Sequence, residues 1–199
     1  GPNPDNNPRL RAAMQNAKAL NMPKDRLEAA IKKATSKEEK DLEIIIYEGY
    51  APHGIAVLVE TATDNHTRTV ANVRSYFNKY GGSLGVTGSV SFMFEHKCNF
   101  RFKKPADLDP EMLELELIDS GCEELSVEGD EVIVYGAFDA FGKLQSYFEQ
   151  HNFEIIESGF DRIPTTTKKL SPEQEEEVNK LLDKIEEDED VQNVYSTME

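Results

Sequence analysis

The sequence predicts an α+β fold, in which an N-terminal helical hairpin unit precedes two ferredoxin-like α/β units, one inserted into the other. A composition of 38% hydrophobic and 30% charged residues is typical of a folded chain rather than a disordered one. Short apolar runs alternate with segments of 3.6-residue periodicity, which indicates a mixture of strands and helices. The order strand-helix-strand-strand-helix-strand can be traced over residues 97–158, and this order is the ferredoxin-like pattern.

Residues 1–41 form the helical unit, which we expect to be truncated at its beginning. Asn7 followed by Pro8 is typical of a helix N-cap and first helical position. Apolar residues recur at helical spacing on both sides of a break at residues 21–23, which predicts an αα-hairpin. Two short helices bury too little apolar surface to be stable alone, so we expect them to pack on another part of the protein.

A discontinuous α/β domain is expected from residues 42–96 joined to residues 159–199. In the first part, strands are predicted over 44–47, 55–61 and 90–94, with a helix over 66–80 that ends at Gly81. In the second part, strands over 160–163 and 191–195 flank a helix that begins with the capping box Ser171–Gln174. Each part is therefore interpreted as a βαβ unit, and the crossover of the first is expected to be right-handed.

Residues 97–158 are expected to form the inserted ferredoxin-like βαββαβ domain. Phe100 and Phe102 mark its first strand and are interpreted as core residues. Asp109–Pro110 is expected to cap a helix that ends at Gly121, and a hairpin is expected to turn across residues 128–130. The strand at 131–135 lacks the basic and aromatic signature of an RNA recognition motif, so base stacking on this sheet is not expected.

The net charge of −16 is unevenly distributed. Residues 1–40 hold nine Lys/Arg and five Asp/Glu, so the remainder of the chain carries −20. Most of the protein therefore repels a phosphate backbone, and nucleic acid is expected to meet the helical unit. Two residues near the 63–65 turn are added as expected contacts. The predicted nucleic-acid-binding residues are Arg9, Arg11, Lys18, Lys24, Arg26, Lys32, Lys33, Thr67 and Arg68.

No metal, cofactor or catalytic residue is expected from the motifs. The four histidines do not have zinc-ligand spacing, and Cys98 and Cys122 are interpreted as reduced, partly buried thiols. Asp64 is interpreted as a turn residue or helix N-cap. A catalytic alternative would require a pocket that gathers Asp64, His66 and His53. The acidic run at 186–190 is interpreted as solvated surface.

Several motifs together resemble the YebC/PmpR family of bacterial gene-expression regulators, whose mitochondrial relatives act as translational activators. The segment YEGYAPHGIAVLVETATDNHTRTVANVRSYFNKYGGSLG is similar to the central signature of that family, and GSVSFMF, FDRIP and DVQNVY follow in the same order. The resemblance implies three domains around a shallow cleft, no enzymatic activity and a cytoplasmic regulator. It also implies that a strongly basic segment precedes the position of Gly1.

The expected function is therefore non-enzymatic regulation of gene expression through nucleic-acid binding, either as a DNA-binding transcriptional regulator or as a ribosome-associated translation factor. Expected partners are promoter DNA or ribosomal RNA, with ribosomal proteins as a further class. No apolar run approaches the length of a membrane span, so a membrane partner is not expected. A small-molecule substrate is not expected either. The alternative is an acidic protein-interaction module that does not bind nucleic acid.

Overall fold

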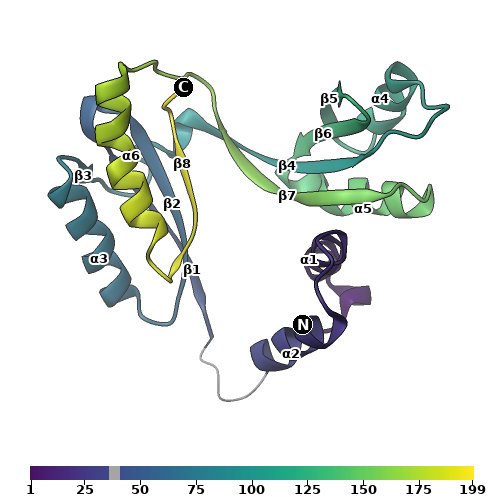
Figure 1. The fold of residues 1–199 in the computed structure, drawn as a ribbon, viewed down its shortest axis with the longest axis horizontal. Coiled ribbons are helices and arrows are strands. Elements are labelled where there is room, and N and C mark those ends of the chain that lie inside the picture. Colours follow the sequence, from purple (N-terminus) through teal and green to yellow (C-terminus); the bar gives the residue numbers. More distant parts are fainter. Residues whose placement is uncertain (36–40) are drawn as a thin grey trace. The chain divides into compact units, whose positions relative to one another are not determined.

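The computed structural model describes residues 1–35 and 41–199 (Figure 1). It confirms an α+β fold with two four-stranded sheets. The described residues form two compact units. Unit 1 comprises residues 1–35 and 96–161, and unit 2 comprises residues 41–95 and 162–199.

The chain begins with the two helices of the predicted hairpin, α1 (Pro8–Ala19) and α2 (Lys24–Ala34), after a short 3-10 turn (Pro4–Asn6). The Asn7 side chain accepts a hydrogen bond from the backbone amide of Leu10 at 3.0 Å, and Pro8 occupies the first helical turn. This is the predicted N-cap. Asn21, between the helices, has a left-handed backbone with φ of 57°, a conformation that asparagine tolerates better than most residues.

The sheet of unit 1 has the strand order β5-β6-β4-β7. Helices α4 and α5 follow β4 and β6 along the chain, so both the element order and the strand order are ferredoxin-like. The elements are β4 (Phe94–Lys103), α4 (Pro110–Ile118), β5 (Cys122–Glu128), β6 (Glu131–Ala137), α5 (Phe141–Gln150) and β7 (Ile155–Pro164).

The core of unit 1 is rich in phenylalanine. Phe100 and Phe102 are almost completely buried, which confirms that they are core residues. Their rings lie 5.1 Å from the ring of Phe148, measured between centroids. Ala12 of α1 belongs to the same buried cluster, so the helical hairpin packs on this domain through its first helix.

The sheet of unit 2 has the strand order β3-β1-β2-β8, in which β1 pairs antiparallel with both β2 and β3. This is a ferredoxin-like strand order with permuted connections, because β1 takes the position that a strand between the two helices would normally hold. The elements are β1 (Glu43–Tyr50), β2 (Ala56–Thr63), α3 (His66–Lys79), β3 (Ser83–Leu84), α6 (Pro172–Glu186) and β8 (Val191–Ser196).

One predicted strand, and the sheet assignment of another, are wrong. Residues 90–94 are not a strand of this sheet, because Ser83–Leu84 forms its short edge strand and a 3-10 turn (Ser91–Met93) precedes β4. Val90 and Phe94 instead pack with Ala56 and Leu58. Residues 160–163 belong to β7, in the sheet of β4, so α6 and β8 join unit 2 without a leading strand of their own.

A buried carboxylate explains why the segment before β4 is not a strand. Glu48 is 4% exposed and accepts hydrogen bonds from the backbone amides of Gly88, Val90 and Ser91 at 2.6, 3.0 and 2.6 Å. Burial opposes ionisation of this carboxyl, but the three amide donors outweigh burial and hold its pKa below the ordinary value. These amides are therefore used by a side chain and not by a neighbouring strand.

Candidate nucleic-acid interface

Helix α1 is fixed to unit 1 by polar contacts as well as by Ala12. Asn16 donates to the carbonyl oxygen of Ser158 at 2.8 Å and accepts from the amide of the same residue at 2.9 Å. Gln145 of α5 donates to the carbonyl of Pro8 at 3.0 Å. These hydrogen bonds fix the position and the orientation of α1 on the domain, because each bond forms only over a narrow range of distances and angles.

Arg11, one of the predicted binding residues, is part of this attachment. Its guanidinium forms a 3.1 Å ion pair with Glu149 of α5 and donates to the carbonyl oxygen of Pro4 at 2.8 Å. The side chain is 25% exposed. Its hydrogen-bonding capacity is therefore largely used within the unit, and its evident role is to position α1.

The other cations of the hairpin belong to exposed residues. The exposed basic residues of the two helices are Arg9, Lys18, Lys24, Arg26, Lys32 and Lys33. Lys24 lies 3.5 Å from Glu28 one helical turn later, but both side chains are more than half exposed, so this pair contributes little. Residues 1–35 contain seven Lys/Arg against three Asp/Glu. The structure therefore gathers seven of the nine predicted binding residues on one hairpin.

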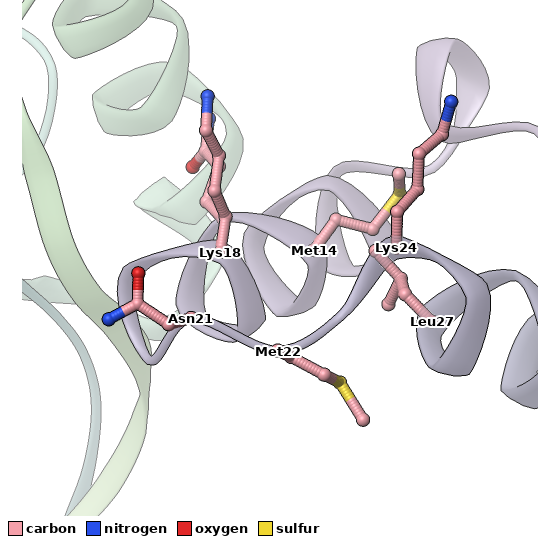
Figure 2. Close-up of a pocket in the computed structure, with 7 residues that line it drawn as sticks. Met14, Lys18, Asn21, Met22, Lys24 and Leu27 are labelled. Carbon is pink, nitrogen blue, oxygen red and sulfur yellow. The ribbon is translucent and has the colours of Figure 1, made fainter.

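A groove of about 540 Å³ lies along the two helices. Met14, Met22 and Leu27 provide its apolar lining, and Lys18 and Lys24 extend to the same side of the hairpin (Figure 2). Helix α2 has no fully buried residue. The hairpin thus combines an accessible apolar groove with exposed cations on its rim.

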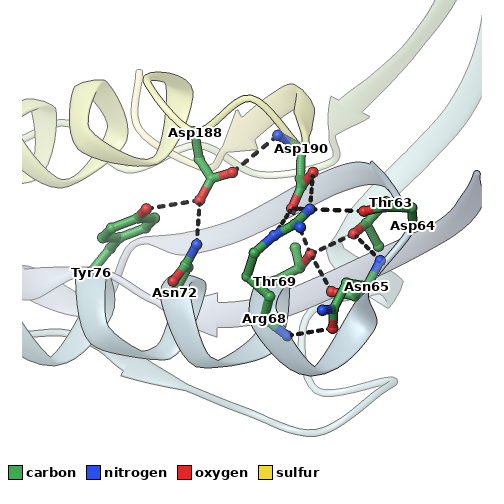
Figure 3. Close-up of polar contacts among 9 residues, drawn as sticks. All are labelled: Thr63, Asp64, Asn65, Arg68, Thr69, Asn72, Tyr76, Asp188 and Asp190. Atoms are coloured by element: carbon green, nitrogen blue, oxygen red, sulfur yellow. Dashed lines mark hydrogen bonds and ion pairs between the residues drawn. The ribbon is translucent and has the colours of Figure 1, made fainter.

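Thr67 and Arg68, the remaining two predicted residues, lie in unit 2 at the start of α3. Arg68 donates to Asp190 at 2.9 Å and to Asp64 at 3.0 Å (Figure 3). Hydrogen bonds to Asp190 and then to Asp64 raise the pKa of the guanidinium above its ordinary value. Thr67 is exposed. These two residues are therefore not part of the hairpin. The positive charge of Arg68 is paired with the carboxylates of Asp190 and Asp64.

The same polar cluster corrects two further interpretations. The N-cap of α3 is Asn65, whose side chain accepts from the amide of Arg68 at 3.0 Å, so the N-cap alternative for Asp64 is wrong. Asp64 lies in the bend before the helix, which agrees with the turn alternative, and it forms an ion pair with Arg68. The acidic run is not entirely solvated. Asp190 accepts from the hydroxyl of Thr69 at 2.8 Å, and Asp188 accepts from Tyr76 at 2.7 Å (Figure 3).

The pKa values within this cluster follow from its geometry. Burial opposes ionisation of Asp190, but donors from Arg68 and Thr69 outweigh it, so the pKa of Asp190 is lowered. Burial and the hydrogen bond to Asp188 raise the pKa of Tyr76 to about 12. Hydrogen bonds to Asp188 and Asp190 therefore fix the α6–β8 connection onto α3.

The catalytic alternative has no assembled site in the described residues. His53 lies in the 3-10 turn between β1 and β2 (Pro52–Gly54), 2.7 Å from Glu177 of α6. Asp64 and His66 follow the opposite end of β2, which is eight residues long. A strand of that length separates them by about 25 Å.

Metal sites, reactive thiols and membrane-spanning helices are also not found in the part of the chain that the structure describes. No group of three or more His, Cys, Asp or Glu is arranged there to hold a metal ion. Cys98 and Cys122 are free and buried, and burial raises the pKa of each thiol to about 11, which makes both poor nucleophiles. None of the described helices has the length and apolar character needed to cross a bilayer.

These features define a class of α+β proteins that carry a basic helical hairpin on a ferredoxin-like domain, joined to a second, permuted sheet. Residues 42–198 match the family described as the TACO1/YebC second and third domain, and residues 1–37 match the TACO1/YebC protein N-terminal domain. The chain belongs to the TACO1/YebC family.

Close relatives share the whole chain. A protein of Flavobacterium psychrophilum is 58% identical over 200 residues, covering 100% of this chain and 84% of the relative. A protein of Parabacteroides distasonis is 58% identical over 198 residues, covering 100% of this chain and 82% of the relative. Both are named probable transcriptional regulatory proteins. The crystal structure of a conserved hypothetical protein from Aquifex aeolicus is similar, with a TM-score of 0.79, 37% identity, and coverage of 100% and 82% of the two chains.

Proposed function

We propose that this protein is a non-enzymatic, cytoplasmic regulator of gene expression that binds nucleic acid through its helical hairpin. The observation that carries the proposal is the gathering of seven Lys/Arg on residues 1–35 of a chain whose net charge is −16. A basic surface on an acidic protein orients it as it approaches a polyanion. The names of the relatives support a regulatory role.

The favoured target is RNA on the ribosome, and promoter DNA is the competing target. An acidic protein can reach ribosomal RNA through one basic surface while its acidic faces meet basic ribosomal proteins. A long DNA duplex would instead bring phosphates close to acidic surfaces elsewhere on the protein. Co-sedimentation with ribosomes and retention of promoter DNA, measured over the same salt series, distinguish the two targets.

Charge reversal on the hairpin is the direct test. The double variant Lys18→Glu, Arg26→Glu is expected to weaken binding at least tenfold and to reduce the slope of log affinity against log salt by about 1.4 to 1.8, if each cation neutralises one phosphate. The matched control is Arg74→Glu, Lys169→Glu, which makes the same change in net charge at exposed positions of unit 2. Equal loss in both variants would contradict a hairpin interface.

A second candidate function has its own support. The exposed face of α6 carries Glu173, Glu176 and Glu177 near its beginning, and Glu186 and Glu187 follow near its end. This surface suits a basic protein partner without any nucleic acid. Two results would favour this function over the first. Binding to ribosomal proteins would persist after nuclease treatment, and any binding to polyanions would not depend on salt concentration.

A further inference from the structure

An aromatic and cationic cluster lies where the start of α1 meets the start of α5, within unit 1. The guanidinium of Arg9 lies 4.7 Å from the ring centroid of Phe160 and 5.7 Å from that of Phe138. The rings of Phe138 and Phe160 are 5.1 Å apart, and the ring of His96 is stacked on Phe138 at 3.9 Å. Arg9 makes no ion pair with the residues that the structure describes.

A cavity of about 510 Å³ opens beside this cluster. Its lining includes Asn6, Arg9, Phe138, Asp139 and Phe160, but not His96. Phe138 is 38% exposed, in contrast to the buried core rings of the same domain. Volumes of this size are typical of sites for small organic groups.

We propose that this cavity binds one unstacked base of single-stranded RNA. The inference rests on the proposed function and adds a base-binding site to an interface otherwise made of cations. Unstacked bases bind on aromatic rings and on guanidinium planes, and here Phe138 and Arg9 offer both on one cavity wall. The Phe138 ring and the Arg9 guanidinium are not on the face of the sheet, where base stacking was not expected.

Two charged side chains of the cavity would orient the bound nucleotide. Asp139 presents a carboxylate, which accepts hydrogen bonds from exocyclic amino groups and repels phosphate. Arg9 presents the opposite charge at the same cavity. The base edge therefore lies toward Asp139 and the phosphate toward Arg9, from where the strand continues over the cations of the hairpin.

Tryptophan fluorescence provides a direct test, because the chain contains no tryptophan. Phe138→Trp places a single tryptophan in the cavity, which can be excited selectively over the tyrosines, and an eight-nucleotide single-stranded RNA is expected to quench it on binding. The matched control is Phe92→Trp, at a 70% exposed phenylalanine of unit 2, which is expected to remain unquenched. An RNA of the same length without bases is expected to bind more weakly and to leave Phe138→Trp unquenched.

Affinity measurements complete the test. Phe138→Ala is expected to weaken single-stranded RNA binding by about 5- to 100-fold, while Phe138→Tyr keeps the aromatic surface and stays near the wild-type value. Wild-type RNA binding with no quenching of Phe138→Trp would overturn the base site and leave the proposed function standing. Absence of RNA binding by the wild-type protein would instead refute the proposed function. Equal quenching by single-stranded DNA would remove the restriction to RNA.

Discussion

Glu48→Ala is expected to lower the free energy of unfolding by about 3–5 kcal/mol, because it leaves three backbone amides without their acceptor. Two of the three, those of Gly88 and Ser91, lie 2.6 Å from the carboxylate, and the Glu48 side chain itself is buried. No other described residue accepts these hydrogen bonds. Chemical denaturation followed by circular dichroism measures the loss. The exposed Glu189→Ala is the control and is expected to change stability by less than about 0.5 kcal/mol.

The same site predicts a dependence on pH. The pKa of Glu48 is lower in the folded protein than in the unfolded chain. Its contribution is therefore fully present above the unfolded pKa, about 4.3, and is lost as the pH falls through the folded value. The stability difference between wild type and Glu48→Gln should be largest near neutral pH and shrink below about pH 4. A difference that stays constant across the acid range would show that the ionised carboxylate is not the stabilising form.

Asp190→Ala is expected to lower the free energy of unfolding by about 2–3 kcal/mol. The substitution removes one of the acceptors of the buried Thr69 hydroxyl and one of the two carboxylates that hold Arg68. The damage should concentrate where the α6–β8 connection meets α3, so hydrogen exchange should accelerate first in α3 and β8. Asp183→Ala, at an exposed position of α6, is the control. Equal exchange rates in both variants would contradict the assigned role.

Helix caps that depend on contacts between residues close together in the sequence were predicted correctly. The Asn7 cap, the Asp109 cap and the Ser171–Gln174 capping box all form as expected, because each depends on a side chain and amides two or three residues away. The strand predicted at 90–94 failed for the opposite reason. Its amides are held by Glu48, about forty residues earlier in the sequence, and no local pattern reveals such a contact.

In the candidate interface, too, local features could be predicted from the sequence and contacts between distant residues could not. Composition was enough to locate the cations of the hairpin, since charge is read directly from the sequence. It could not show that Arg11 is paired with Glu149, or that Arg9 lies on Phe138 and Phe160. These partners are more than 120 positions away in the sequence, and only the folded domain brings them together. For the same reason Arg68 could not be matched to Asp190 in advance.

The position of β8 in the sheet has a consequence for how this protein is synthesised. Strand β2 is the first of its pair to leave the ribosome, and its partner β8 follows all the other described helices and strands. Until then the buried strand Ala56–Thr63 has an unpaired edge, and such edges are templates for aggregation. The inserted domain between them can fold first, because domains generally fold as units in the order in which they emerge. A nascent chain that stops short of Val191 therefore carries a finished domain and an open sheet, and β8 (Val191–Ser196) is the strand that closes this edge.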